Sequence, residues 1–310
     1  MTNPVTDSVS IVVPTFGNAQ GLELLARSIL EILRRENRTF EILFVNDGSP
    51  DATWDTIQHI NSSNPEVRGI NLMRNYGQHS ALLAGIFTAR YDIVVTLDDD
   101  FQTPPTEIPK LLSKIDEGFD LVYGARNKEQ HGLIRNQASR VTKWLVQHTM
   151  NAPLARSITS FRAFRRDLMR YYPRSEPPLV FIDALLDWTA QKITTVSVAH
   201  SPRVTGKSNY SWAKLLAHTV NMVTGLSVVP LQLAVWLGFL ITCMGVCLFV
   251  FVMASYFLQG SRVPGFTFLA SVILLFSGVQ LCVLGIIGEY LARVYLRLHG
   301  KPAFVIKEML

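Results

Sequence analysis

Short apolar runs and helical stripes alternate along the first 125 residues of the chain. The apolar runs end at Pro, Gly, Asn or Asp and predict buried strands, which we place at Ser10–Pro14, Glu41–Val45, Val67–Leu72, Ile93–Leu97 and Leu121–Tyr123. Segments with apolar residues every three or four positions predict helices between them, at Gly21–Leu33, Thr53–Ile60, Ala81–Ala89 and Glu107–Glu117. Repeated strand–helix units favour an α/β domain with a mostly parallel sheet and helices on both faces.

Two long stretches in the second half carry no charged residue. The first runs from Leu215 to Ser261, and the second runs from Val263 to Gly288. Each is long enough for a membrane span of about 20 residues. Two buried core helices are the weaker alternative, because soluble helices rarely lack charge for so long. We therefore expect transmembrane helices near Pro230–Leu258 and Phe266–Ile287.

Basic residues flank both charge-free stretches. They are Lys192, Arg203, Lys207 and Lys214 before the spans, and Arg293, Arg297, Lys301 and Lys307 after them. Only Arg262 lies in the short connection between the predicted spans. Because basic flanks stay on the cytoplasmic side, we expect the N-terminal domain and both termini to face the cytoplasm. Residues 1–10 are polar and show no signal peptide, which agrees with this orientation.

The composition predicts four parts of the chain. We expect a catalytic domain over residues 1–210, a juxtamembrane amphipathic helix over 211–229, two transmembrane helices over 230–288 and a cytoplasmic C-terminal helix or tail over 289–310. The 310 residues, with a net charge of +5 and 48% hydrophobic residues, permit one sizeable soluble domain plus additional elements. All cysteines fall in the predicted spans, which excludes a disulfide framework or thiolate zinc site from the catalytic domain.

Polar residues follow the predicted strands at the edge where ligands bind in parallel sheets. Asp47 and Arg74 each follow a strand, and Asp98, Asp99 and Asp100 follow another. Three adjacent carboxylates repel one another, and a hard divalent cation with oxygen ligands relieves that repulsion. Such a cation suits a diphosphate leaving group, so the sequence favours a nucleotide-diphosphate enzyme. The alternative is an acidic loop that caps the next helix.

Several common enzyme classes lack their motifs here. Pro14–Asn18 stands where a glycine-rich dinucleotide fingerprint would follow the first strand, and no P-loop is present. The chain also has no Gly-x-Ser-x-Gly elbow for acyl transfer. These absences argue against nicotinamide enzymes, the common kinases and α/β-hydrolases.

Motifs along nearly the whole chain resemble one family in order and spacing. They are Pro14–Asn18, Val45–Asp51, Arg74–Gly85, Asp98–Pro105, Phe161–Arg165 and Arg203–Tyr210. With two C-terminal spans, the chain resembles the polyprenyl-phosphate glycosyltransferases, the GT-A-fold family 2 enzymes that include dolichyl-phosphate mannose synthase. The segment Arg74–Ser80 is most similar to the bacterial enzymes that transfer formamido-arabinose to undecaprenyl phosphate.

This resemblance implies a reaction and its partners. It implies inverting transfer of a sugar, expected to be UDP-linked, from a nucleotide-diphosphate donor to undecaprenyl phosphate, with Mg²⁺ or Mn²⁺ as cofactor. The enzyme would act at the cytoplasmic face of the inner membrane for cell-envelope glycan or lipid modification. The expected partners are the donor, the lipid acceptor and the bilayer, with no nucleic acid. A homo-oligomer is also expected, because two spans leave little membrane packing within one chain.

The resemblance also implies roles for individual residues. Asp98, Asp100 and Gln102 would bind the metal, and the nucleotide would contact Pro14, Phe16, Asp47, Arg74 and Asp98. The acceptor phosphate would be held by Arg126 and Arg140, whose guanidinium groups suit bidentate phosphate binding. Arg162 joins the catalytic set through its matched stretch. Arg203 and Lys207 belong to a loop that would close over the donor diphosphate.

The sequence allows more than one role for two of the acidic residues. Asp47 either recognises the nucleotide base or stabilises its own Asp-Gly turn. An extended strand would turn Asp99 away from its neighbours, so we expect it outside the metal site, as a solvent-exposed or helix-capping carboxylate.

Two rival functions are weaker. A processive polysaccharide synthase would carry Gln-x-x-Arg-Trp, but Val141 follows Gln137–Arg140, and only two spans are predicted. A non-catalytic membrane-tethered nucleotide-binding scaffold would not require the acidic and basic residues of the predicted site.

Overall fold

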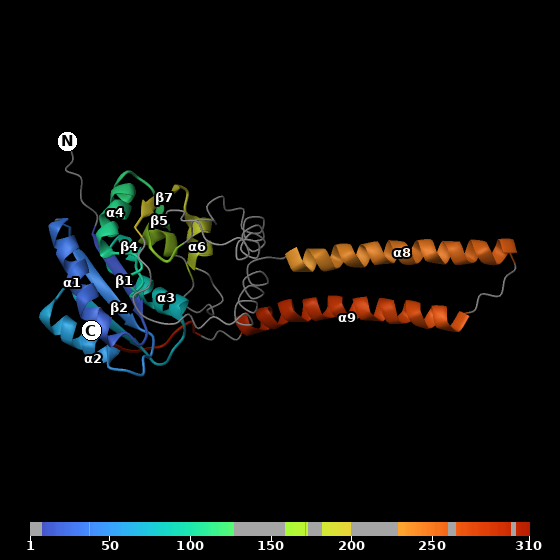
Figure 1. The fold of residues 1–310 in the computed structure, drawn as a ribbon, viewed down its shortest axis with the longest axis horizontal. Helices are drawn as coiled ribbons and strands as arrows, with labels where there is room; N and C mark the ends of the chain where they lie inside the picture. The colour runs from blue at the N-terminus through green and yellow to red at the C-terminus, as the bar shows by residue number, and fades with distance from the viewer. Residues whose placement is uncertain are drawn as a thin grey trace. The chain divides into compact units, whose positions relative to one another are not determined.

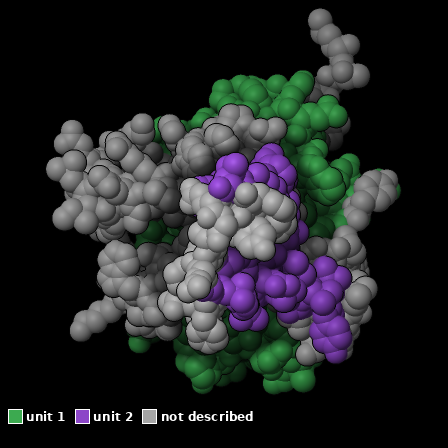
Figure 2. Space-filling model, turned by 90° about the vertical axis from the view of Figure 1, so that its right-hand side faces the viewer, with its two compact units in different colours: residues 1–209, 300–310 green, residues 210–299 purple. Residues whose placement is uncertain are grey.

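The computed structural model describes residues 8–36, 38–126, 159–170, 172, 182–199, 229–259, 265–298 and 302–310. The chain divides into two compact units (Figure 2). The first comprises residues 1–209 together with 300–310, and the second comprises residues 210–299. The last residues of the chain therefore belong to the same unit as the N-terminal strands.

A mixed β-sheet organises the first unit (Figure 1). Its strands are β1 (Val9–Thr15), β2 (Phe40–Asn46), β3 (Val67–Leu72), β4 (Ile93–Thr96), β5 (Leu121–Arg126), β6 (Arg162–Arg165), β7 (Ile193–Val198) and β8 (Ile306–Met309). Over the described residues their order is β7-β5-β6-β4-β1-β2-β3-β8. Strand β1 lies between β2 and β4 and is parallel to both, so the order of connections reverses beside it. That reversal is the place where open α/β sheets bind ligands.

Helices cover both faces of this sheet. They are α1 (Ala19–Arg35), α2 (Thr53–Ser63), α3 (Gln78–Thr88), α4 (Ile108–Asp116) and α6 (Ile182–Thr189), with 3₁₀ turns at Pro105–Glu107 and Arg166–Met169. Helices α1, α2 and α4 contribute to one hydrophobic cluster, and α3 and α6 contribute to the other. The fold is thus a three-layer α/β arrangement, which agrees with the predicted class.

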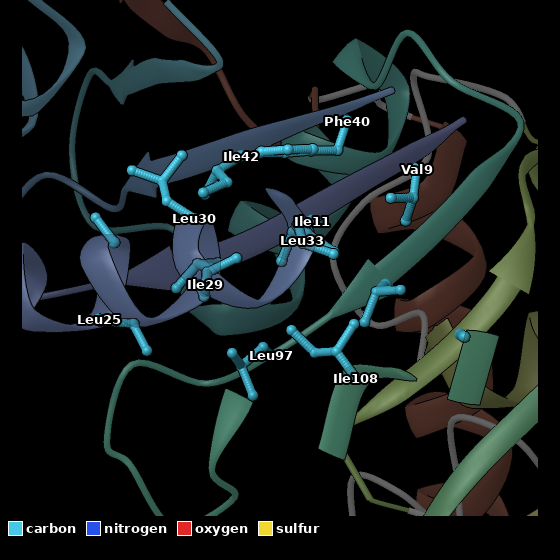
Figure 3. Packing of buried hydrophobic residues seen from close by; sticks show 14 of the residues in the cluster. Val9, Ile11, Leu25, Ile29, Leu30, Leu33, Phe40, Ile42, Leu97 and Ile108 are labelled. Atoms are coloured by element: carbon cyan, nitrogen blue, oxygen red, sulfur yellow. The ribbon is translucent and has the colours of Figure 1, made fainter. Parts of the chain in front are cut away.

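The spacing of apolar residues in α1 explains how it docks. Leu25, Ile29 and Leu33 recur at four-residue intervals and are fully buried. Figure 3 shows these side chains on the sheet side of the helix, near Ile11 of β1 and Ile42 of β2. This packing holds α1 against β1 and β2.

The strands and helices predicted over the first 125 residues are found, with their ends shifted by a few residues. The juxtamembrane helix predicted over 211–229 lies outside the described residues, apart from its last position. The expectation of a mostly parallel sheet is confirmed, and two reversed strands among the described ones make the sheet mixed. Strand β6 runs antiparallel to β4 and β5, and β8 runs antiparallel to β3. Strands β6, β7 and β8 were not among the predicted elements.

A buried carboxylate ties together the opposite end of the sheet from the predicted site. Glu41, which is only 3% exposed, accepts hydrogen bonds from Ser10 Oγ at 2.7 Å and from the Arg90 amide at 2.6 Å. Its second oxygen pairs with Arg68 Nη1 at 2.8 Å. These bonds join β1, β2 and β3 to the chain that leads into β4.

We expect Glu41→Ala to lower the free energy of unfolding by about 3–5 kcal/mol, because it breaks a largely buried ion pair and leaves the Arg68 guanidinium and the Arg90 amide without this acceptor. Glu41→Gln keeps the size and one acceptor oxygen, so its loss should be smaller. Denaturant unfolding of the full chain in detergent measures both. An alanine variant within about 1 kcal/mol of wild type would contradict this role.

The second unit contains two long helices, α8 (Val229–Gln259) and α9 (Gly265–Leu298). They pack against each other where the Phe276 ring lies over Gly245, since a Cβ there would stand 2.8 Å from the ring. Large apolar side chains are exposed along both helices, among them Trp236, Phe251 and Leu281. Among the residues that the structure describes, no helix is both long and apolar enough to cross a membrane. The two predicted spans stay a prediction.

Candidate active site

The carboxyl ends of β1, β2 and β4 border a pocket of about 240 Å³. Pro14, Thr15 and Phe16 line it from β1, and Asp47 lines it from the end of β2. The three aspartates after β4 also line it, as do Asn75, Gly77 and Gln78 around the start of α3. Residues from four separated sequence motifs therefore meet at the reversal of the sheet.

Both carboxylate oxygens of Asp98 are hydrogen-bonded beside the pocket. Its Oδ1 accepts a hydrogen bond from Gln78 Nε2 at 2.8 Å, and its Oδ2 accepts one from Ser160 Oγ. Burial raises the pKa of Asp98, and the neighbouring charges of Asp100 and Asp99 add to the rise, whereas the Ser160 bond opposes it. A cation at this position would relieve the repulsion among the neighbouring carboxylates.

Asp99 is hydrogen-bonded to the end of β1 and to the loop that follows it. Its carboxylate accepts a hydrogen bond from Thr15 Oγ1 at 2.6 Å, and its backbone carbonyl accepts one from Asn18 Nδ2 at 2.9 Å. These contacts join the loop after β4 to the loop after β1. The expectation of a solvent-exposed or helix-capping Asp99 is therefore wrong, because the side chain is partly buried against β1.

The turn after Asp100 is strained. Phe101 has a positive φ of 56°, which is uncommon for a residue with a bulky side chain. The Gln102 amide donates to Asp100 Oδ1 at 3.1 Å, and this bond closes the turn. Such strain is found at functional sites, where the surrounding structure holds it.

The carboxylates of this pocket suit a divalent cation that takes only one or two of its ligands from the protein. No three His, Cys, Asp or Glu side chains converge as a metal cage within the described part of the chain. Mg²⁺ usually takes one or two carboxylates and completes its shell with substrate phosphates and water. Asp98 and Asp100 supply those carboxylates. A bound cation would neutralise their negative charges and so remove the repulsion between them.

Asp47 holds the neighbouring loop through both of its oxygens. It accepts hydrogen bonds from the amides of Tyr76 at 2.7 Å and Gly77 at 2.8 Å. Burial raises the pKa of Asp47, and these two bonds oppose the rise. Gly48, at φ 65°, has no space for a side chain, because a Cβ would lie 2.4 Å from the Arg74 carbonyl carbon. The side-chain hydrogen bonds of Asp47 thus go to the loop after β3, while the turn after β2 is bonded by Asn46 Oδ1, which accepts from the Ser49 amide at 3.2 Å.

Arg74 lies on that second loop and is exposed to solvent. Its guanidinium stands over the Tyr76 ring, with Cζ 4.8 Å from the ring centroid. This cation–π contact keeps the side chain beside the pocket, although Arg74 does not line it.

Arg162 is buried behind Asp98 instead of facing solvent. It is 1% exposed and forms an ion pair with Asp183 of α6. Burial lowers the pKa of Arg162, while the charges of Tyr123, Asp98 and Asp187 oppose that shift. Tyr123 Oη in turn donates to Asp187 Oδ1 at 3.0 Å. Arg162 is therefore a buried counter-charge for the acidic site.

Several predicted residues cannot be placed. Arg140, Arg203 and Lys207 lie outside the described residues, and Arg126 is described only as the last backbone position of β5. Three contributors were missed by sequence reasoning, namely Thr15, Gln78 and Ser160. Each is a neutral residue inside or beside a recognised motif, and residue type alone gave no sign of its contact with an aspartate.

Comparison with known proteins places these features in a family. Residues 10–172 match the model of "Glycosyl transferase family 2". Undecaprenyl-phosphate 4-deoxy-4-formamido-L-arabinose transferases from Salmonella choleraesuis and Salmonella paratyphi B are each 32% identical over 305 residues, covering 97% of this chain and 93% of the relative.

A solved structure shares the fold. Glucosyl-3-phosphoglycerate synthase from Mycobacterium tuberculosis, crystallised with Mn²⁺, uridine diphosphate and phosphoglyceric acid, superposes with a TM-score of 0.54 at 20% identity. The match covers 71% of this chain and 77% of that one. The mixed sheet is accordingly the GT-A, Rossmann-like α/β fold. The chain belongs to glycosyl transferase family 2 and is a glycosyltransferase of the polyprenyl-phosphate group.

Proposed function

We propose that this protein transfers a sugar from a UDP-linked donor to undecaprenyl phosphate, with inversion at the anomeric carbon. The observation that supports it most is the pocket where Asp98 and Asp100 meet the ends of β1 and β2. The relatives that match over 97% of the chain are named for transfer to the same lipid phosphate. The sugar itself is left to experiment.

The reaction is a direct displacement. A lipid phosphate oxygen forms a bond to the anomeric carbon, the bond from that carbon to the nucleotide diphosphate breaks, and the electron pair leaves with the diphosphate. Because the nucleophile is already an anion near neutral pH, no protein base is required. Catalysis is then positioning and charge stabilisation.

The proposed roles divide between the donor and the acceptor. Asp98, Asp100 and Gln102 would hold Mg²⁺ or Mn²⁺, which would neutralise charge on the departing diphosphate. Pro14 and Phe16 line the pocket and would form the side of it that contacts the nucleotide base. The remaining contacts are proposals from sequence: Arg74 with the nucleotide, Arg126 and Arg140 with the acceptor phosphate, and Arg203 and Lys207 with the donor diphosphate.

Arg162 acts indirectly in this scheme. Because its side chain is buried, Arg162 would not contact a mobile lipid headgroup directly. Ser160, two residues before it, donates to Asp98, and strand β6 pairs Arg162 with Thr96 of β4. Arg162 thus supports the carboxylate that holds the cation.

The proposed site of action is the cytoplasmic face of the inner membrane, because the acceptor is a lipid. The exposed apolar side chains of α8 and α9 would contact lipid or further copies of the chain. The two-span arrangement, with the catalytic unit cytoplasmic and a homo-oligomer in the bilayer, is proposed from the sequence.

The topology predicts a protease pattern in sealed vesicles. Tags are placed at Met1 and in the connection between Gln259 and Gly265, because Leu310 packs against the core and does not suit a tag. Inverted vesicles should lose the Met1 tag and protect the loop tag, since basic flanks stay cytoplasmic. Cleavage of the loop tag from the cytoplasmic side would refute this topology.

A donor screen tests the function. Membranes holding the chain are given undecaprenyl phosphate, Mn²⁺ and one radiolabelled UDP- or GDP-sugar at a time, with UDP-formamido-arabinose included. Label should enter the organic phase with a UDP-sugar only when the lipid phosphate is present. A water-soluble polymer product would favour the processive synthase, and nucleotide binding with no product would favour the scaffold.

A further inference from the structure

The last residues of the chain pack on both sides of the catalytic sheet. We call residues 302–310 the C-terminal segment. On one side Ala303 is 2% exposed, and the Phe304 ring lies 6.4 Å from the Phe87 ring. On the other side Leu310 packs against the cluster that contains α1 and α2, and Trp54 Nε1 donates to Glu308 Oε2 at 3.0 Å. The segment is therefore anchored to both faces of the first unit.

Its backbone completes the edge of the sheet. Strand β8 pairs with β3, with Met309 opposite Ile70 and Glu308 opposite Asn71. The Leu310 amide donates to the Gly69 carbonyl at 2.9 Å. At the far end the Met73 amide donates to the Val305 carbonyl, also at 2.9 Å. The segment thus holds β3 up to the first residue beyond the strand.

That end of β3 leads directly into the pocket. We call Met73–Gly77 the pocket loop. Its last two amides, on Tyr76 and Gly77, donate to the buried Asp47 carboxylate. Asn75 and Gly77 line the pocket, as does Asp47 itself. One end of this loop is fixed by the C-terminal segment and the other by Asp47.

A second line of contacts leaves β3 through its side chains. Asn71, which lies opposite Glu308, accepts a hydrogen bond from Asn46 Nδ2 at 2.9 Å within the core. Asn46 Oδ1 accepts from the Ser49 amide at 3.2 Å, and Ser49 Oγ accepts from the Gly17 amide at 3.0 Å. Gly17 follows Phe16, which lines the pocket. The pocket loop and the turn at Phe16 and Gly17 therefore both depend on the position of β3.

We infer that the C-terminal segment is a positioning element for the nucleotide, holding the pocket loop in its binding geometry. Helix α9 ends at Leu298, so only three residues separate it from the segment. The inference rests on the proposed function, in which this pocket binds the donor nucleotide.

The test compares two altered chains with wild type in detergent. One chain ends at Lys301, and the other keeps its full length with Phe304→Ala and Leu310→Ala. Equilibrium binding of UDP with Mn²⁺ gives the affinity, and hydrogen exchange of the Tyr76 and Gly77 amides reports the pocket loop without any nucleotide. Glu308→Gln is the matched control, because it keeps the acceptor oxygen for Trp54.

We expect both altered chains to bind UDP about 10-fold or more weakly, a loss comparable with one net hydrogen bond in a binding site. Exchange at Tyr76 and Gly77 should be faster, and a synthetic peptide of residues 302–310 should restore both properties to the shortened chain. The control should match wild type. If the shortened chain does not fold, the full-length double variant decides.

A segment that only stabilises the fold would give a different result. Thermal unfolding would then occur at lower temperature, while UDP affinity and exchange at the pocket loop stayed at wild-type values in the folded double variant. That outcome overturns the inference. If wild type itself does not bind UDP, the proposed function fails, whereas the exchange measurement still judges the role of the segment.

Discussion

Asp100→Asn is expected to lower kcat by about 100-fold or more, equivalent to about 3 kcal/mol of barrier. The substitution leaves an oxygen that still accepts from the Gln102 amide, so the turn with its strained Phe101 is retained. What it removes is a negative charge beside Asp98. Initial rates at saturating donor and acceptor, across a range of Mn²⁺ concentrations, measure the loss.

Asp99→Asn is the matched control for that prediction. Its amide oxygen still accepts the Thr15 hydroxyl, and Asp99 does not belong to the proposed metal site. Its kcat should fall far less than that of Asp100→Asn. EDTA should abolish turnover of wild type, and added Mg²⁺ or Mn²⁺ should restore it. Full activity in EDTA or in Asp100→Asn would contradict the metal role.

Asp47→Ala is expected to weaken nucleotide binding by about 30- to 1,000-fold, which corresponds to about 2–4 kcal/mol. The variant leaves the Tyr76 and Gly77 amides without their shared acceptor, so the loop that lines the pocket loses its anchor. The apparent KM for undecaprenyl phosphate should change little. Direct binding of UDP and steady-state kinetics with both substrates separate the two effects.

Arg140→Ala should give the reverse pattern. In its proposed role Arg140 would bind the acceptor phosphate bidentately, so kcat or the acceptor KM should deteriorate by a similar factor. Binding of the free nucleotide should stay near wild type. The two variants are compared only after matched unfolding curves, because an arginine or a buried carboxylate can be structural. Weak nucleotide binding in Arg140→Ala with normal acceptor kinetics would show that the site is divided incorrectly.

The parts of the fold predicted from sequence are those with local signals. Strands β1 to β5 are apolar runs ended by turn residues, and α1 shows four-residue spacing of buried leucine and isoleucine. Strand β8 has no such signal, since Ile306–Met309 alternates only weakly and one of its four residues, Lys307, is a cation. It becomes a strand because β3 offers an unpaired edge, which is a property of the assembled sheet.

The candidate site was predicted to a similar degree. Asp98, Asp100 and Asp47 were identified because charged residues at strand ends stand out against apolar runs. The partners that orient them were not, since Gln78 and Ser160 are distant in sequence from Asp98. The sequence placed Arg162 in the catalytic set, but its side chain is buried and paired with Asp183. Such contacts depend on tertiary packing, which residue type does not specify.

The most direct test of direct displacement is the identity of both products from a single turnover. Purified protein is mixed with undecaprenyl phosphate, Mn²⁺ and the UDP-sugar that the donor screen selects, labelled in both the uridine and the sugar. Our account predicts that the nucleotide product is UDP and that the lipid product is a monophosphate sugar with inverted anomeric configuration. Release of UMP, with the sugar joined to the lipid through a diphosphate, would contradict it.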